Sequence, residues 1–191
     1  MGTATTEQVL TQPIQMIGLG RLMGQWTSME PTARLLLLVL LCQAEILLEQ
    51  FQDGLSASNV LFVTLGSAWV YEHLSNSGIV ANCHKQPLRD FKKRLLSSDE
   101  IVGQWTKTIH QLNKNYPALN IVFTVSPVRH IKDGMVENAR SKSILLEAVH
   151  QLTEQNSQVE YFPVYEFFMD ELRDYAYYKK DGIHPNEIAI D

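Results

Sequence analysis

The chain has 191 residues, enough to bury most of the surface of its unfolded form in a single core without a disulfide or a metal. A hydrophobic share of 45%, a charged share of 19% and a formal net charge of -5 predict a globular protein, and they argue against a surface that neutralises nucleic-acid phosphates. The two cysteines, Cys42 and Cys83, lie in unlike contexts, which favours a reducing, cytoplasmic compartment over a disulfide framework.

The N-terminal part divides into two segments. Residues 1–30 show no sustained hydrophobic period and no secretory signal, so we expect an irregular segment before a domain that covers residues 31–191. The pattern then predicts a helix over residues 31–52, with Gly54 as its C-terminal cap. Its apolar run, residues 35–42, is far shorter than the roughly 20 residues that span a bilayer, so we expect a buried helix and no membrane partner.

From residue 59 onward, apolar runs alternate with helical patterns. Buried strands are predicted at residues 59–66, 120–127 and 159–165. Helices are predicted at residues 87–97, 99–115, 138–155 and 166–175. Ser97 and Glu100 have the spacing of a capping box. This alternation predicts an α/β protein, a three-layer α/β/α sandwich around a parallel sheet.

Polar side chains follow each predicted strand. Parallel sheets bind ligands beyond the carboxyl ends of their strands, so these residues should converge on one crevice: Ser67, Trp69, Arg129, His130, Tyr165 and Glu166. Arg129 and His130 suit a substrate carboxylate or phosphate. The alternative for Arg129 is an internal ion pair with Glu72 or Glu166.

The segment "DGIHP" carries the most specific chemistry. A carboxylate that holds one imidazole nitrogen leaves the other free to act as a general base, and Asp181 and His184 are close enough in a turn to make this contact. Pro185 favours an extended backbone at His184 and suits the first position of a helix. The alternative is an ordinary surface turn.

Several ordered blocks of the sequence resemble the GSCFA domain family. They are "TLGSAWVYE", "GIVANCHKQP", "TVSPVRHIKDG", "NARSKSILLEAV", "YFPVYE" and "DGIHP". That family is similar in fold to the SGNH, or GDSL-like, hydrolases. The resemblance implies an SGNH-hydrolase-like (flavodoxin-like) sandwich, here incomplete at both ends, and the activity of a serine esterase.

The resemblance also implies roles for individual residues. Asp181 would orient His184, and His184 would be the base, placed beside the turn at Gly66. The family's serine should lie in the GSCFA motif, which this chain lacks. Ser67 is therefore the candidate nucleophile; the alternative is a serine that satisfies its own turn.

The remaining candidate residues surround this centre. Gly66 and Asn82 are the candidates for the oxyanion hole, although asparagines in such loops also serve turns. The candidate substrate-binding residues are His84, Arg129, His130 and Glu166.

Two rival hypotheses remain open. Cys83, His84, His130, Asp181 and His184 are zinc-capable residue types, but they form no close ligand pair, so neither a metal nor a cofactor is expected. The missing serine motif instead favours a ligand-binding or remnant domain without activity. For an active enzyme we expect a small-molecule or glycan ester as substrate, the glycan by fold analogy alone.

Overall fold

The computed structural model describes residues 47, 49–75, 78–80 and 87–191. The chain divides into two compact units, Met1–Ser58 and Asn59–Asp191. In the first unit the described residues are helical up to Ala57, so the predicted C-terminal cap at Gly54 is wrong and the helix continues past it. The rest of the predicted helix, the apolar run at residues 35–42 and the predicted domain boundary at residue 30 lie outside the described residues.

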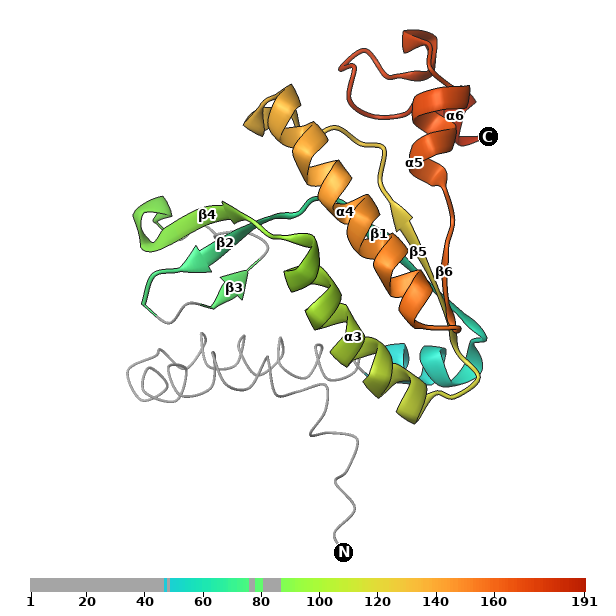
Figure 1. Cartoon of the computed structure of the whole chain (residues 1–191). Helices are drawn as coiled ribbons and strands as arrows, with labels where there is room; N and C mark the ends of the chain where they lie inside the picture. Colours follow the sequence, from blue (N-terminus) through green and yellow to red (C-terminus); the bar gives the residue numbers. More distant parts are fainter. Residues whose placement is uncertain (1–46, 48, 76–77, 81–86) are drawn as a thin grey trace, which may run out of the picture. The chain divides into compact units, whose positions relative to one another are not determined.

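The second unit contains a parallel sheet of three strands (Figure 1). The strands are β1 (Val60–Leu65), β5 (Asn120–Val125) and β6 (Val159–Tyr161). Their order is β1-β5-β6, so β5 is central. The register pairs Val60 with Asn120 and Ile121 with Val159. All three predicted strands are therefore present in this sheet.

Two of these strands differ from the prediction in detail. β6 ends at Tyr161 because Pro163 has no N–H to donate and precedes a helical turn, α5 (Val164–Glu166). β1 was expected to be fully buried, but its residues alternate between exposed and half-buried. Phe62 is 64% exposed, so one face of this edge strand is not covered by the described residues.

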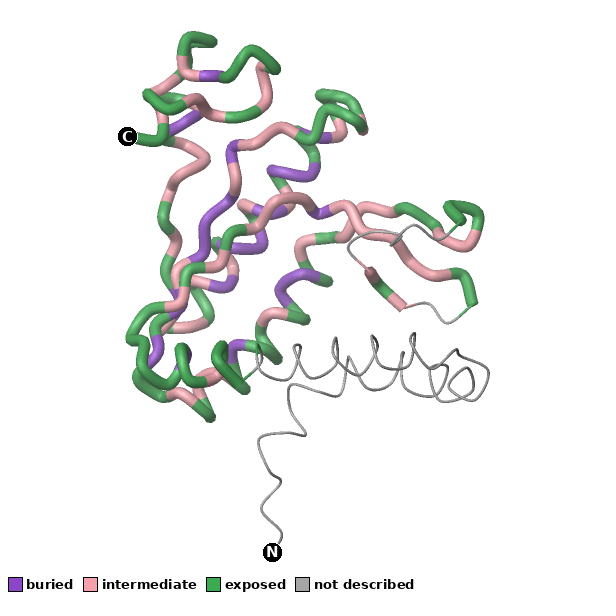
Figure 2. Tube along the Cα trace, turned by 180° about the vertical axis from the view of Figure 1, so that it is seen from behind, coloured by how far each residue is buried: buried purple, intermediate pink, exposed green. Residues whose placement is uncertain are grey.

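Two long helices pack with the sheet to form the core. They are α3 (Ser98–Asn115) and α4 (Met135–Gln155), which contact one another, and α4 also contacts β5 and β6. Phe123 of β5 is completely buried and meets Trp105 of α3 edge to face, with 4.8 Å between ring centroids. In Figure 2 the buried segments follow β5 and the two helices.

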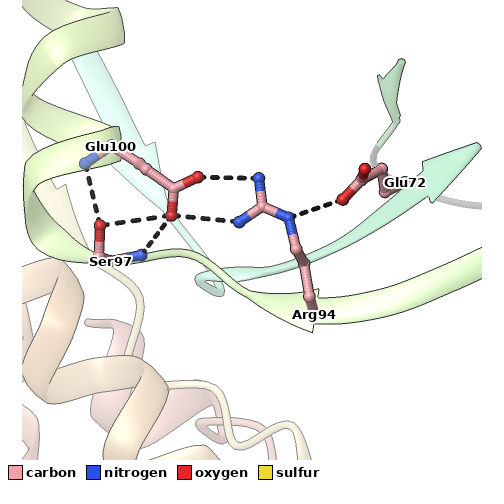
Figure 3. Close-up of polar contacts among 4 residues, drawn as sticks. All are labelled: Glu72, Arg94, Ser97 and Glu100. Carbon is pink, nitrogen blue, oxygen red and sulfur yellow. Dashed lines mark hydrogen bonds and ion pairs between the residues drawn. The ribbon is translucent and has the colours of Figure 1, made fainter. Parts of the chain in front are cut away.

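The start of α3 forms the predicted capping box. The Ser97 hydroxyl accepts a hydrogen bond from the Glu100 N–H, and the Glu100 carboxylate accepts one from the Ser97 N–H. Arg94 extends this network, because its guanidinium binds both Glu100 and Glu72 (Figure 3). The cap is therefore tied to the neighbouring strands.

A second, antiparallel sheet was not predicted. It has the order β3-β2-β4 and consists of β2 (Trp69–His73), β3 (Ile79–Val80) and β4 (Phe91–Leu95). The helix predicted at residues 87–97 is wrong: only a 3-10 turn, η1 (Leu88–Asp90), precedes β4. The local helix preference of lysine, arginine and leucine is overruled by five pairs between β4 and β2.

The C-terminal region is a chain of short elements. After α5 come a π-helical stretch, η3 (Phe167–Glu171), a 3-10 turn, η4 (Tyr175–Tyr177), and a terminal helix, α6 (Glu187–Ile190). Pro185 does not open α6 as predicted. It bridges to Tyr178 in an antiparallel pair, and Asn186 caps the helix.

The molecule is thus a mixed α/β protein with a parallel three-stranded sheet and several helices. None of the helices in the part of the chain that the structure describes is long and apolar enough to cross a membrane.

Candidate functional site

Asp181 and His184 form a carboxylate–imidazole pair. The Asp181 Oδ2 lies 2.7 Å from the His184 Nδ1. The other carboxylate oxygen, Oδ1, accepts hydrogen bonds from the backbone N–H groups of Ile183 and His184, at 2.8 and 3.1 Å. The hydrogen bond from His184 and these two amides lower the pKa of Asp181 to about 2. The carboxylate is therefore ionised near neutral pH and can accept a proton from the His184 Nδ1; in the neutral tautomer that donates this bond, Nε2 is the nitrogen left without a proton.

The turn that carries this pair is fixed by its backbone. Gly182 has a φ of +66°, a conformation that glycine adopts without strain. The Gly182 N–H donates to the Lys179 carbonyl, and the Lys179 N–H donates to the His184 carbonyl. Together with the Tyr178–Pro185 bridge, these bonds hold Asp181 and His184 at the end of a closed loop.

His184 lines a cavity of about 430 Å³. The wall comes from three parts of the second unit: the loop that follows β5, the antiparallel sheet and the C-terminal turn. The lining residues are Tyr71, Lys93, Val128, Arg129, His130, Ile131, Lys132, Asp133, Ile183 and His184. A cavity of this size suits a small molecule.

Arg129 joins the loop after β5 to the C-terminal turn. Its guanidinium donates a hydrogen bond to the Gly182 carbonyl at 3.2 Å and lies 4.3 Å from the centroid of the Tyr178 ring. The internal ion pair offered as the alternative for Arg129 is wrong, because Glu72 pairs with Arg94 and Glu166 accepts from a tyrosine hydroxyl. Arg129 instead faces the cavity beside His184.

His130 connects the same cavity to the end of β1. Its backbone N–H donates to the Asn138 Oδ1 at 2.8 Å, and a Cβ placed on Gly66 would lie 3.6 Å from its Nε2. Partial burial, followed by the charge of Lys142, lowers the pKa of His130. The structure thus brings Asp181, His184, Arg129 and His130 together and places Gly66 next to His130.

Ser67 is turned toward its own loop and toward α4. Its Oγ accepts a hydrogen bond from the Trp69 N–H at 3.1 Å and lies 3.2 Å from the Ser141 Oγ. It is not among the residues that line the cavity. These contacts match the alternative in which Ser67 satisfies its turn.

Lys142 is a buried cation that sequence reasoning missed. It is 1% exposed, and its Nζ donates to the carbonyls of Gly66 and Ser126, at 2.6 Å each. Burial lowers its pKa to about 8. Lys142 therefore joins the ends of β1 and β5, the two strands that lead into the predicted crevice.

A signal for Lys142 was present in the sequence. The buried face of α4 begins with Asn138, Ser141 and Lys142 and continues with Leu145 and Ala148. Polar residues at the start of an otherwise apolar stripe indicate that buried polar groups have specific partners. Lys93 and Tyr71 carried no such signal, because their place in the wall depends on the unpredicted antiparallel sheet.

The remaining predicted site residues lie elsewhere. Glu166 accepts a hydrogen bond from the Tyr161 hydroxyl at 2.6 Å and does not line the cavity. Burial, followed by the hydrogen bond to this carboxylate, raises the pKa of Tyr161. Asn82, Cys83 and His84 lie outside the described residues. Among the residues described, no group of three or more His, Cys, Asp or Glu side chains is arranged to hold a metal ion.

Comparison with known proteins gives a match to a protein family. The model of the GSCFA family matches residues 19–191, which is most of the chain. Neither a search of the curated proteins nor a search of the solved structures found a match. The family match covers the strands, the cavity and the Asp181–His184 turn described above.

Proposed function

Because the chain belongs to the GSCFA family, we propose that it is a hydrolase domain that cleaves esters, with His184 as the general base and Asp181 as the carboxylate that orients it. The observation that carries the proposal is the 2.7 Å contact between the Asp181 Oδ2 and the His184 Nδ1, made by a histidine that lines a cavity. Carboxylate, imidazole and cavity are the parts that base-catalysed acyl transfer requires.

The proposed reaction begins at the free nitrogen of His184. This Nε2 takes the proton of an attacking hydroxyl while that oxygen bonds to the ester carbonyl carbon. The carbonyl electron pair moves to its oxygen, returns as the bond to the alcohol breaks, and the leaving alcohol takes the proton from His184. If the hydroxyl belongs to a serine, water then cleaves the acyl-serine by the same route.

Two nucleophiles are consistent with this scheme. Ser67 is the candidate within the described residues, but to attack a substrate its hydroxyl must leave Ser141 and the Trp69 N–H. A water molecule activated directly by His184 needs no such change. For the oxyanion, Gly66 and Asn82 stay predictions, as does the substrate class, a small-molecule or glycan ester.

The finer fold assignment, an SGNH-like three-layer sandwich, is part of the same proposal. α3 and α4 supply one helical layer on the parallel sheet. On β1, the side chains of Val60 and Phe62 are 44% and 64% exposed. Apolar side chains of this kind are what a helical layer on the other face would cover.

A short-chain aryl ester assay tests the proposal. His184→Ala and Asp181→Asn should each lower kcat/KM by about 10²-fold to 10⁴-fold, the usual contribution of a positioned base. A fluorophosphonate probe separates the nucleophiles: labelling that is lost in Ser67→Ala assigns the serine, whereas turnover without labelling assigns water.

A second candidate function is binding without catalysis. It is favoured by the contacts that hold the Ser67 hydroxyl in its own loop and against Ser141. The test is made between pH 6 and 9, because Asp181, with a pKa of about 2, is ionised throughout this window. If purified protein neither hydrolyses the ester nor reacts with the probe there, this second function replaces the first.

A further inference from the structure

The cavity beside His184 carries positive charge in an acidic chain. The formal net charge of the whole chain is -5. Yet three cationic side chains, Lys93, Arg129 and Lys132, line the cavity together with one carboxylate, that of Asp133. The nearby Asp181 carboxylate is occupied by the His184 imidazole and by two backbone amides. An acidic protein that gathers cations in one cavity provides a local field that attracts anions.

The three cations differ in whether their charge is already paired with a carboxylate. Lys93 forms an ion pair with Asp133 and lies over the rings of Trp69 and Tyr71, 5.2 and 5.7 Å from their centroids. Arg129 is half-buried, and in the part of the chain that the structure describes neither Arg129 nor Lys132 has an ion pair with a carboxylate. Their charges are therefore available to a ligand.

The bonding of Arg129 leaves donors free. A guanidinium has five N–H groups in a planar fork, and the structure uses one nitrogen, Nη1, for the Gly182 carbonyl. The guanidinium carbon also lies 4.3 Å from the centroid of the Tyr178 ring, a cation–π contact. The remaining donors suit the paired oxygens of a carboxylate or phosphate.

The hydrogen bond from Arg129 to the Gly182 carbonyl also holds the guanidinium near His184, the proposed base. Gly182 lies two residues before His184, and both Arg129 and His184 line the cavity. An oxyanion on Arg129 would therefore occupy the cavity whose wall includes the imidazole. One small molecule can then reach both groups, since a volume of about 430 Å³ lies within the usual range for ligand cavities.

We propose that the cavity binds an ester whose acyl or alcohol part carries a carboxylate or phosphate, held by Arg129 and Lys132 while His184 acts at the ester carbonyl. The catalytic part of this inference rests on the proposed function. The anion-binding part does not, because it depends only on the cations and the cavity. The two parts can therefore be tested separately.

The binding test uses inorganic phosphate and succinate as probes. Either anion, titrated into ¹⁵N-labelled full-length chain at low salt, should shift the amide resonances of residues 128–133 and 182–184. Arg129→Gln should weaken this binding by about tenfold or more, the effect of losing a charge-assisted hydrogen bond. Lys132→Gln, an exposed position, should weaken it without endangering the fold. Comparing the two anions distinguishes phosphate from carboxylate as the preferred group.

The control is a cation of the same unit outside the cavity. Arg89 has a side chain that is 86% exposed and does not line the cavity, so Arg89→Gln makes the same change in net charge. Binding should survive this change. If neither anion shifts the cavity resonances, or if all three variants bind equally, the anion site does not exist and the inference is overturned.

The catalytic test compares two aryl esters of similar size, a neutral butyrate and an anionic hemisuccinate. The inference predicts a higher kcat/KM for the hemisuccinate, competitive inhibition by the preferred free anion, and a ratio that falls toward one in Lys132→Gln. Equal turnover of both esters overturns the catalytic part of the inference and leaves the proposed function standing. No turnover of either ester, with anion binding intact, rejects the proposed function and the catalytic part of the inference alone.

Discussion

At the residue scale, Lys142 determines whether the backbone carbonyls just beyond β1 and β5 have a hydrogen-bond donor. Its ammonium supplies the hydrogen bonds to the Gly66 and Ser126 carbonyls, and Gly66 is the glycine beside His130. Lys142→Met keeps the apolar stem but leaves both carbonyls without this donor. Because a buried polar group that loses its partner costs about 1–3 kcal/mol, we expect the free energy of unfolding to fall by about 2–4 kcal/mol in urea titrations. A loss below about 0.5 kcal/mol would contradict this role.

The charge of Lys142 also gives stability a pH dependence of known sign. Its pKa is about 8 in the folded protein and near 10.4 in an unfolded chain. Between these values the unfolded chain holds the proton and the folded protein has released it, so stability rises with pH. Below pH 8 both states are protonated and the slope vanishes. The measurement is the unfolding free energy of the protein minus that of Lys142→Met, which should increase from pH 8 to pH 10.

At the element scale, the capping box of α3 shows what local sequence can predict. Ser97 and Glu100 are three residues apart, and the structure forms both of their reciprocal bonds. Ser97→Ala should lower the free energy of unfolding by about 1 kcal/mol, the usual cost of removing a helix N-cap. Ser143→Ala is the matched control, because Ser143 is an exposed residue inside α4 whose hydroxyl donates to the Ala139 carbonyl of the preceding turn. This change should alter stability by less than about 0.5 kcal/mol. Equal losses in the two variants would argue against the cap.

The same capping box makes the protein sensitive to acid. Arg94 and the Ser97 N–H lower the pKa of Glu100 to about 2, below its ordinary value. The stabilisation is present above the ordinary pKa of glutamate, near 4.3, and is lost as the pH falls toward 2. Because the Glu100 side chain is 43% exposed, solvent and salt reduce its size. The difference in stability between the protein and Glu100→Gln should therefore shrink from pH 5 to pH 2.

The antiparallel sheet shows where local sequence fails. Residues 91–95, "FKKRL", contain helix-forming lysine, arginine and leucine, and nothing in their spacing indicates strand β4. Their conformation is set by pairing with β2, which begins at Trp69. The parallel strands were predictable because each is a continuous apolar run in the sequence, and those of β5 and β6 pack against α4 in the core. The same holds for the residues of the candidate site. The segment "DGIHP" could be recognised from the sequence, whereas the places of Lys93 and Tyr71 in the cavity wall depend on the antiparallel sheet, which was not predicted.

At the scale of the whole second unit, the site is assembled from distant segments. The base lies on a C-terminal turn, its cavity is walled by the loop after β5, and Arg129 joins the two across 53 residues of chain. The C-terminal turn is also stabilised by hydrogen bonds of the Asn186 side chain. The Asn186 side chain donates to the Ala176 carbonyl at 2.6 Å and accepts from the Ala189 N–H at 3.1 Å. The orientation of His184 should therefore depend on a residue that does not line its cavity.

Asn186→Ala tests this dependence. The variant removes the side-chain bonds to the Ala176 and Tyr178 carbonyls and to the Ala189 N–H. It keeps the backbone bond from the Asn186 N–H to the Tyr177 carbonyl, so the domain should stay folded, with a loss of about 1 kcal/mol. Amide hydrogen exchange should accelerate at Lys179 and Gly182, whose N–H groups close the loop, and stay slow in β5. Turnover of the aryl ester should fall with the loss of protection, because a base that is no longer held in place loses its effective concentration. Asn156→Ala is the matched control, because its side-chain amide donates to the Leu152 carbonyl at the end of α4. In this variant, amide exchange at Lys179 and Gly182 should be unchanged. Faster exchange in the loop with unchanged turnover would show that the catalytic base lies elsewhere.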